Sequence, residues 1–360
     1  MFVADLHNDL VQRIIEGEDV TKETPHGHTD IPRLRESCIN LQILIIWVSS
    51  KSAEPNFFNK ANRMFDDIEK LSQEKDVVIP KNLEDVLEGV NSNKLLLPIS
   101  MEGGEAIENN IENLYHFISR GLIYLGPTWN HSLDWVSSNY DEKYNKEKIK
   151  TIGLNDFGKE VINICQENKV LIDVSHIGEK SFWDIENISQ KPFIASHSSV
   201  NKICPHFRNL HDDQIIAIKN KNGLIGINPY PFFIDPTFKE RESKVRNQHK
   251  EKIKSIEIQH SKKSSQWLAK QHFFQKELSS VCPDIDIFLD HMEYIIKLAG
   301  VDYVGVGSDY DGLDCLPKGW NDCRDHIKIA QRLESRGYSQ LEIEKVMGKN
   351  ILRVLEEINY

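Results

Sequence analysis

Apolar runs of strand length alternate with stretches of helical spacing along almost the whole chain of 360 residues. The strand-like runs cover residues 2–8, 39–48, 95–101, 122–129, 170–175, 192–196, 223–228 and 302–307. The helical stretches cover residues 56–75, 105–119, 153–168, 178–188, 210–220, 284–299, 324–336 and 339–357. Strands that alternate with helices form parallel sheets, and eight such units close into a ring more readily than they make two open sheets. The pattern therefore predicts an α/β fold, a (β/α)8 TIM barrel.

An open, doubly wound sheet is the alternative fold. Such a sheet usually carries a phosphate-binding glycine turn after its first strand, and none follows Asp9. The chain shows no internal repeat and no low-complexity linker, so we expect a single barrel domain over residues 1–360. The loop 21–37 follows the first strand and is expected to wall the site.

Residues 232–283 form a polar, lysine-rich and glutamine-rich insertion after the seventh predicted strand. Loops of that length without secondary structure are rare inside a domain, so helices are expected there. Two interpretations stay open: a helical lid over the site, or a solvated helical excursion without a catalytic role.

Composition indicates what kind of molecule the protein binds. A formal net charge of -11 argues against a nucleic-acid surface, because phosphate binding needs clustered lysine and arginine. A small-molecule substrate is the better expectation. The six cysteines lack paired metal spacing, which indicates neither a disulfide framework nor a thiolate zinc site. No signal segment, anchor or membrane-length apolar run is found, so we expect a cytoplasmic protein without a membrane partner.

The carboxyl ends of the strands carry the chemistry in a barrel of this kind. Residues of ligand or aromatic type stand at these predicted ends: His7, Asp9, Trp47, Glu102, Trp129, Asn130, His176, His197, Asn228 and Asp309. His7 and Asp9 are two apart on an extended strand, so their side chains point to the same side. Taken alone, His7 is equally well a buried core histidine. The agreement of several strand ends favours a metal site.

Consecutive strands end in His176 and His197, and an earlier strand ends in Glu102. The donor set of nitrogen and oxygen favours zinc or a similar first-row ion. The spacing indicates one ion at His7 and Asp9, a second at the other two histidines, and Glu102 between them. Two such ions with a bridging hydroxide would lower the pKa of the water and polarise a carbonyl.

The last predicted strand ends in two aspartates, Asp309 and Asp311. Asp309 lies on the same face as the glycines that precede it and is the candidate to carry a proton from the bridging hydroxide to a leaving nitrogen. Asp311 is of the same type. Its place before Gly312 favours a role in an Asp-Gly turn.

Six sequence elements, taken together and in this order, resemble the renal (membrane) dipeptidase family of zinc peptidases, peptidase family M19 of the amidohydrolase superfamily. They are Asp5-Leu-His-Asn-Asp-Leu10, Met101-Glu-Gly-Gly104, Leu171-Ile-Asp-Val-Ser-His176, Ala195-Ser-His-Ser-Ser199, Arg208-Asn209 and Val304-Gly-Val-Gly-Ser-Asp-Tyr-Asp-Gly312. The resemblance implies that His7 and Asp9 bind one zinc ion, His176 and His197 bind the other, and Glu102 bridges both.

The same resemblance implies a role for two further residues. Asp309 becomes the proton shuttle, and Arg208 takes the terminal carboxylate of the substrate. A guanidinium matches a carboxylate with two parallel hydrogen bonds, which agrees with that role.

One position departs from the family pattern. Many members carry a histidine on the fourth strand that grips the substrate carbonyl, and Trp129 stands in that place here. An indole only donates, and only from one nitrogen. Either Trp129 lines the substrate pocket while the two metals polarise the carbonyl alone, or Asn130 or His131 replaces the histidine.

The leading hypothesis is a binuclear zinc dipeptidase that acts on free dipeptides. The resemblance adds tolerance of a D residue at the C-terminal position and a homodimer. A related amidohydrolase acting on N-acyl amino acids or another small amide is the nearest alternative. Such relatives commonly use His-x-His on the first strand and a modified lysine on the fourth, and this chain has neither. A metal-binding protein without catalysis is the third hypothesis.

Overall fold

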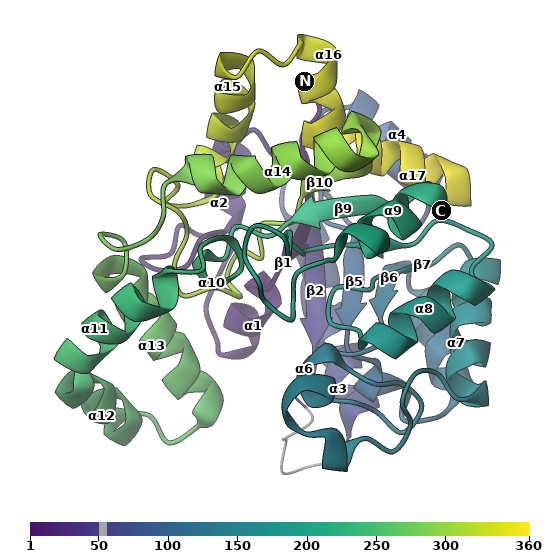
Figure 1. The fold of residues 1–360 in the computed structure, drawn as a ribbon, viewed down its shortest axis with the longest axis horizontal. Helices are drawn as coiled ribbons and strands as arrows, with labels where there is room; N and C mark the ends of the chain where they lie inside the picture. Colours follow the sequence, from purple (N-terminus) through teal and green to yellow (C-terminus); the bar gives the residue numbers. More distant parts are fainter. Residues whose placement is uncertain (50–55) are drawn as a thin grey trace.

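Parallel strands at the centre of the fold follow one another around a circuit. The computed structural model describes residues 1–49 and 56–360 (Figure 1). The strands of the circuit are β1 (Ala4–Asn8), β2 (Leu41–Trp47), β5 (Ile99–Glu102), β6 (Leu122–Gly126), β7 (Leu171–Ile172), β8 (Ile194–Ala195), β9 (Leu224–Ile227) and β10 (Val304–Val306). Neighbours pair in parallel, and isolated bridges join Asp173 to Ile194 and Asn8 to Tyr310. The pairings therefore return to β1.

Each strand of the circuit lies in or overlaps one of the predicted apolar runs. The run 95–101 is divided into β4 (Leu95–Leu96) and β5, with Pro98 between them. Proline has no amide hydrogen and cannot continue the ladder of hydrogen bonds. β4 pairs with β2 and with a short strand that the sequence did not predict, β3 (Val77–Val78).

Both faces of the strands are buried. In β2, Leu44 and Ile46 belong to the apolar cluster shared with the outer helices, whereas Ile43 and Ile45 belong to a second, inner cluster. Successive residues of a strand point to opposite faces, which explains the division. The inner cluster also contains four residues of α17 (Asn350–Ile358), so this helix closes one end of the strands and leaves the other end for chemistry.

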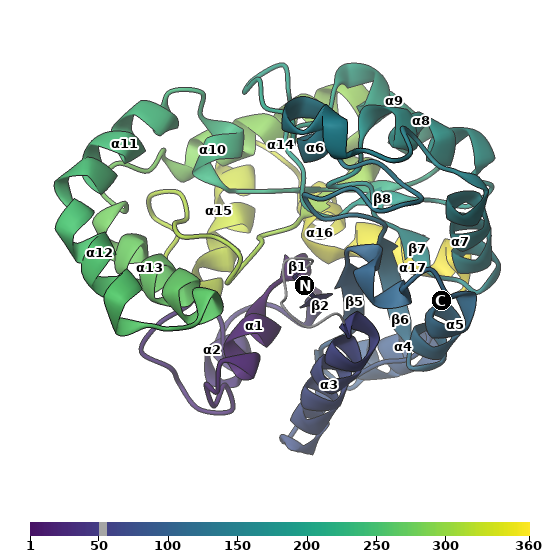
Figure 2. The same ribbon diagram turned by 90° about the horizontal axis from the view of Figure 1, so that it is seen from below.

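Helices surround the strands (Figure 2). They are α1 (Leu10–Ile15), α2 (Ile31–Glu36), α3 (Phe57–Lys70), α4 (Leu83–Asn91), α5 (Ile111–Ser119), α6 (Asn139–Tyr144), α7 (Asp156–Glu167), α8 (Glu179–Ile188), α9 (Asp212–Asn220), α14 (Ile285–Ala299), α15 (Ile327–Ser335), α16 (Gln340–Glu344) and α17. The predicted helix 105–119 starts later, because Glu108 and Asn109 take left-handed backbone angles. No helix in the described part of the chain has the length and apolar character needed to cross a bilayer.

The insertion after β9 is helical, as predicted. It contains α10 (Pro231–Ile234), α11 (Phe238–Gln248), α12 (Lys250–Gln259) and α13 (Lys263–Glu277). Figure 2 shows α11 to α13 as a lobe beside the strands, beyond α1 and α2. The Gln271 side-chain amide donates to the carbonyls of Asp311 and Leu313, at 2.6 and 2.7 Å. The lobe is thus attached to the loop that follows β10.

Candidate metal centre

Five predicted ligands meet at the carboxyl ends of the strands. Glu102 Oε1 lies 3.0 Å from His176 Nε2, 3.5 Å from His197 Nε2 and 3.9 Å from His7 Nε2. Asp9 Oδ2 lies 3.7 Å from His7 Nε2. All five side chains are buried. Residues almost 200 positions apart in the chain therefore form one compact group of nitrogen and oxygen donors.

The centre of this group lacks the hydrogen bonds that buried polar atoms normally make. Glu102 Oε1 has no hydrogen-bond partner within the described residues, although three imidazoles face it. His176 Nε2 and His197 Nε2 lie 3.1 Å apart. A buried carboxylate oxygen without a donor is costly, and a cation among these atoms removes that cost. The residues present therefore fit a metal.

Three overlapping groups have ligand atoms close enough to share an ion. They are His7, Asp9 and Asp309; Glu102, His176 and His197; and His7, Asp173 and His197. The second group holds the residues predicted for one subsite together with Glu102. The first holds His7 and Asp9 of the other predicted subsite, with Asp309, the predicted proton carrier, in place of Glu102. The third includes Asp173, to which the sequence analysis gave no role.

Each histidine of the group has a polar side chain at its Nδ1 atom. Tyr124 Oη lies 3.0 Å from Nδ1 of His7, and Asn130 Oδ1 lies 3.1 Å from Nδ1 of His176. Ser196 Oγ lies 2.8 Å from Nδ1 of His197. These contacts fix the rings and leave each Nε2 toward Glu102. Partners of this kind orient metal-ligating histidines in general.

Burial sets the protonation of the group. It lowers the pKa of His7, His176 and His197 well below the ordinary value, so these imidazoles are neutral and keep a lone pair for an ion. Burial also raises the pKa of Asp9 and Glu102 well above the ordinary range, with Asp309 adding to the effect on both. A divalent cation would offset this repulsion between carboxylates.

Asp309 lies next to the predicted ligands. Its Oδ2 accepts a hydrogen bond of 3.0 Å from Asn228 Nδ2, and burial raises its pKa to about 6. Its φ of 55° is left-handed, a conformation that occurs more often at functional sites than elsewhere. Gly312 makes room here, since a Cβ at that position would lie 2.2 Å from Asp309 Oδ1 and 2.4 Å from Asp9 Oδ2.

Arg208 is buried behind the histidines. Its Nη1 donates to the carbonyl of Ser175, and its Nη2 donates to the carbonyl of His197 at 3.3 Å. Its Nε has no hydrogen-bond partner among residues 1–49 and 56–360. The guanidinium is therefore held in place by backbone oxygens and keeps one buried donor.

Trp129 lies beside the same group. Its ring centroid is 6.3 Å from that of His176 and 4.8 Å from that of Trp47, the aromatic residue at the end of β2. The two indoles meet edge to face, an arrangement that aromatic pairs favour. Together they form an aromatic wall at the strand ends.

Sequence reasoning assigned no role to Tyr124, Asp173 and Ser196, which contact the histidines or one another. Asp173 and Ser196 stand inside the motifs that carried the family resemblance, and this position was the available signal. Tyr124 lies within β6, where an inward-facing aromatic residue cannot be told from core by sequence.

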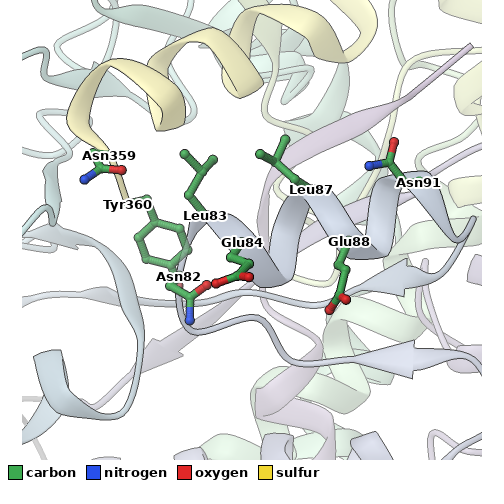
Figure 3. Close-up of a pocket in the computed structure, with 8 residues that line it drawn as sticks. All are labelled: Asn82, Leu83, Glu84, Leu87, Glu88, Asn91, Asn359 and Tyr360. Atoms are coloured by element: carbon green, nitrogen blue, oxygen red, sulfur yellow. The ribbon is translucent and has the colours of Figure 1, made fainter.

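A groove of about 470 Å³ lies on a different part of the molecule (Figure 3). It is lined by Asn82, Leu83, Glu84, Leu87, Glu88, Asn91, Asn359 and Tyr360. The Tyr360 hydroxyl donates to the carbonyl of Gly121, directly before β6, which puts the groove near the amino ends of the strands. None of the predicted ligands borders it.

Comparison with known proteins gives a family match over the whole chain. A family model described as membrane dipeptidase (peptidase family M19) matches residues 1–360. The chain is 30% identical over 253 residues to an uncharacterized protein in the PQQ-III 3' region of Acinetobacter calcoaceticus, covering 63% of this chain and 79% of that protein. It is 24% identical over 364 residues to human Dipeptidase 3, covering 99% of this chain and 65% of the human protein.

A solved structure matches the fold over its full length. It is the crystal structure of a metallo peptidase from Rhodobacter sphaeroides, liganded with a phosphinate mimic of the dipeptide L-Ala-D-Ala. The TM-score is 0.79 at 22% identity, covering 100% of this chain and 99% of that one.

Proposed function

Because the chain belongs to the membrane dipeptidase family of metallopeptidases, peptidase family M19, we propose that it hydrolyses the peptide bond of free dipeptides with two zinc ions. The L-Ala-D-Ala mimic bound by the Rhodobacter protein supports a dipeptide substrate and tolerance of a D residue at its C-terminal position. The homodimer implied by the resemblance is part of the same proposal.

One observation carries the proposal: three neutral imidazoles turn their Nε2 atoms toward an unpartnered oxygen of Glu102 within the described residues. His7 and Asp9 would hold one ion, His176 and His197 the other, and Glu102 would contact both. When bound, two such ions supply an activated water at neutral pH and polarise the substrate carbonyl.

Asp309 is proposed to move the proton. Its Oδ2 is fixed by the Asn228 amide, and the carboxylate lies next to Asp9, where the attacking water would be bound. A pKa raised to about 6 by burial lets this carboxylate accept a proton near neutral pH and return it to the leaving nitrogen.

Arg208 is proposed to bind the terminal carboxylate of the dipeptide. The backbone carbonyls of Ser175 and His197 already orient its guanidinium, which reduces the entropy lost on binding. A cation at a fixed distance from the reacting carbonyl selects short peptides, because a longer chain puts its carboxylate elsewhere.

Trp129 and Asn130 remain predicted substrate-binding residues. The aromatic wall of Trp47 and Trp129 supports a pocket lined by Trp129. The side-chain oxygen of Asn130 is engaged by His176, which supports a role in orienting that ligand alongside any contact with substrate.

The circuit of parallel strands supports a (β/α)8 TIM barrel forming one domain over residues 1–360, with a helical insertion after the seventh strand. The hydrogen bonds from Gln271 to the loop after Asp309 support a lid at 232–283.

Release of amino acids from a panel of L,L and L,D dipeptides, tripeptides and N-acyl amino acids tests the function. The protein is stripped with a chelator, measured, reloaded with zinc and measured again. We expect cleavage of dipeptides alone, lost on chelation and restored by zinc. Cleavage confined to N-acyl amino acids, or no cleavage by zinc-loaded protein, would overturn the substrate class.

A further inference from the structure

The hydroxyl of Ser196 lies among several buried polar groups, including the Ser175 hydroxyl at 3.3 Å. Its Oγ is 2.6 Å from Asp173 Oδ2, 2.8 Å from His197 Nδ1 and 3.3 Å from His7 Nδ1. Asp173, His7 and His197 are also the third group with the spacing of metal ligands. Since the Ser196 oxygen stands within 3.3 Å of all of them, this third group is a hydrogen-bonded hub around a hydroxyl.

The donors around Asp173 settle the direction of these hydrogen bonds. Its carboxylate accepts from the amide and the hydroxyl of Ser175 and from the amide and the hydroxyl of Ser196. A carboxylate only accepts, so the hydroxyl hydrogen of Ser196 points at Asp173. The lone pairs of Ser196 Oγ then face His197 and His7, and these rings must donate from Nδ1.

Tyr124 contacts the ring of His7, on the side of one predicted metal subsite. Its hydroxyl donates to the carbonyl of Leu6 at 3.0 Å and accepts from His7 Nδ1 at 3.0 Å. The His7 N–H is therefore shared between Tyr124 and Ser196, whereas Ser196 is the acceptor for His197.

The backbone holds Ser196 in this position. A Cβ at Gly226 or at Gly307 would lie 2.0 or 1.9 Å from the Ser196 carbonyl oxygen, so glycine on β9 and after β10 allows this close approach. The Ser196 amide donates to Asp173 Oδ1 at 2.8 Å. With its backbone held in this way, the hydrogen bond of 2.6 Å from its hydroxyl to Asp173 Oδ2 keeps that hydroxyl beside the two rings.

We propose that Ser196, oriented by Asp173, is a positioning residue shared by both metal subsites, so that this one hydroxyl supports the binding of both ions. The inference rests on the two-metal assignment of the proposed function. It follows that removing the Ser196 hydroxyl weakens the binding of both ions, whereas removing the Tyr124 hydroxyl weakens only the binding of the ion at His7 and Asp9.

Zinc affinity measured by chelator competition tests the proposal, with zinc content per chain measured alongside. In Ser196→Ala both affinities should fall by about 10–100-fold, the usual effect of losing a partner of a ligating histidine. In Tyr124→Phe one affinity should fall and the other stay unchanged. Ser100→Ala is the matched control. The buried hydroxyl of Ser100, on β5, has no hydrogen-bond partner in the described structure. Both of its affinities should equal the wild-type values.

A second variant and a spectrum guard against a folding defect. Asp173→Asn keeps the shape but weakens the hold on Ser196, and it should lower both affinities by about 10-fold. Circular dichroism of the metal-free variants establishes that they are folded, and the absorption of the cobalt-loaded protein should change for both ions in Ser196→Ala. If wild type binds two ions and both serine and aspartate variants keep wild-type affinities, or lose only one ion, the shared role is wrong. If wild type itself binds no pair of ions, the two-metal assignment fails instead.

Discussion

Asp309 and Asp311 are two residues apart on the loop after β10, both buried and both with left-handed backbone angles, yet their surroundings are opposite. Asp311 accepts hydrogen bonds from the backbone amide of His28, the Thr29 hydroxyl and the guanidinium of Arg13. Asp309 accepts from the neutral amide of Asn228 and lies next to Asp9, another carboxylate.

The pKa values follow this contrast. Burial by itself would raise the pKa of Asp311. The guanidinium of Arg13, together with the other donors, outweighs burial and holds this pKa below its ordinary value. Burial raises the pKa of Asp309 to about 6. A buried carboxylate with a complete set of protein donors stabilises the fold. A buried carboxylate beside another carboxylate is available to bind a cation, a water or a proton. Residue type and burial alone do not separate the two roles.

Asp309→Asn should give the largest effect. The amide keeps the shape and the hydrogen-bonding reach of the side chain but cannot carry the proton, so kcat should fall by about 10²–10⁴-fold. Zinc content per chain should stay at the wild-type value. The measurement is dipeptide turnover by zinc-loaded protein, with metal analysis of the same sample. Turnover within a factor of two of wild type would remove Asp309 from the mechanism.

Asp311→Asn should act on stability. It leaves the buried guanidinium of Arg13 with Glu18 as its remaining carboxylate partner, and breaking a buried ion pair costs about 3 kcal/mol or more. Urea denaturation of the metal-free protein measures the loss. Turnover per folded, zinc-loaded molecule should stay close to wild type. A variant as stable as wild type, but catalytically impaired, would reverse the roles of the two aspartates.

Zinc should raise the free energy of unfolding through the metal ligands around Asp309, and the increment should not depend on Asp311. At a free concentration of 100 times Kd, a bound ion adds about 2.7 kcal/mol to the free energy of unfolding. We expect this increment for each of the two proposed ions in wild type and, from a lower baseline, in Asp311→Asn. Glu102→Gln should lose most of it, because the carboxylate between the subsites is gone. Thermal unfolding with and without zinc measures the increment, and an equal increment in Glu102→Gln would contradict the bridging role.

The sequence predicted the strands and the residues at their ends because both depend on local pattern. Buried strands need apolar runs, and the ends of parallel strands lie together whatever the loops do. It also assigned Asp311 to a turn, although it gave no sign of Arg13 as a partner, since that contact joins residues 298 apart. Ser196 and Asp173 could not be given roles for the same reason. Their function depends on which way a hydroxyl hydrogen points, and that is fixed by neighbours from other strands.

The pH dependence of stability gives the smallest and sharpest comparison. In the metal-free folded protein Asp309 keeps its proton up to about pH 6, whereas the unfolded chain releases it near the ordinary value of 3.8. Between these values the folded state binds more protons, so this residue's contribution to stability falls as pH rises, by at most about 1.4 kcal/mol per pH unit. For Asp311, with a lowered pKa, the contribution is present above pH 3.8 and is lost as pH falls through the folded value.

Urea unfolding of the metal-free wild type, Asp309→Asn and Asp311→Asn at pH values from 3 to 6 separates the two cases. The free energy of unfolding of Asp309→Asn relative to wild type should rise between pH 4 and pH 6, because the variant has no charge to bury. That of Asp311→Asn should fall relative to wild type as the pH rises from 3 to about 4, because only wild type gains the ion pair with Arg13. Differences of the same sign for both variants would mean that the two carboxylates share one environment, and the contrast between site and scaffold would not hold.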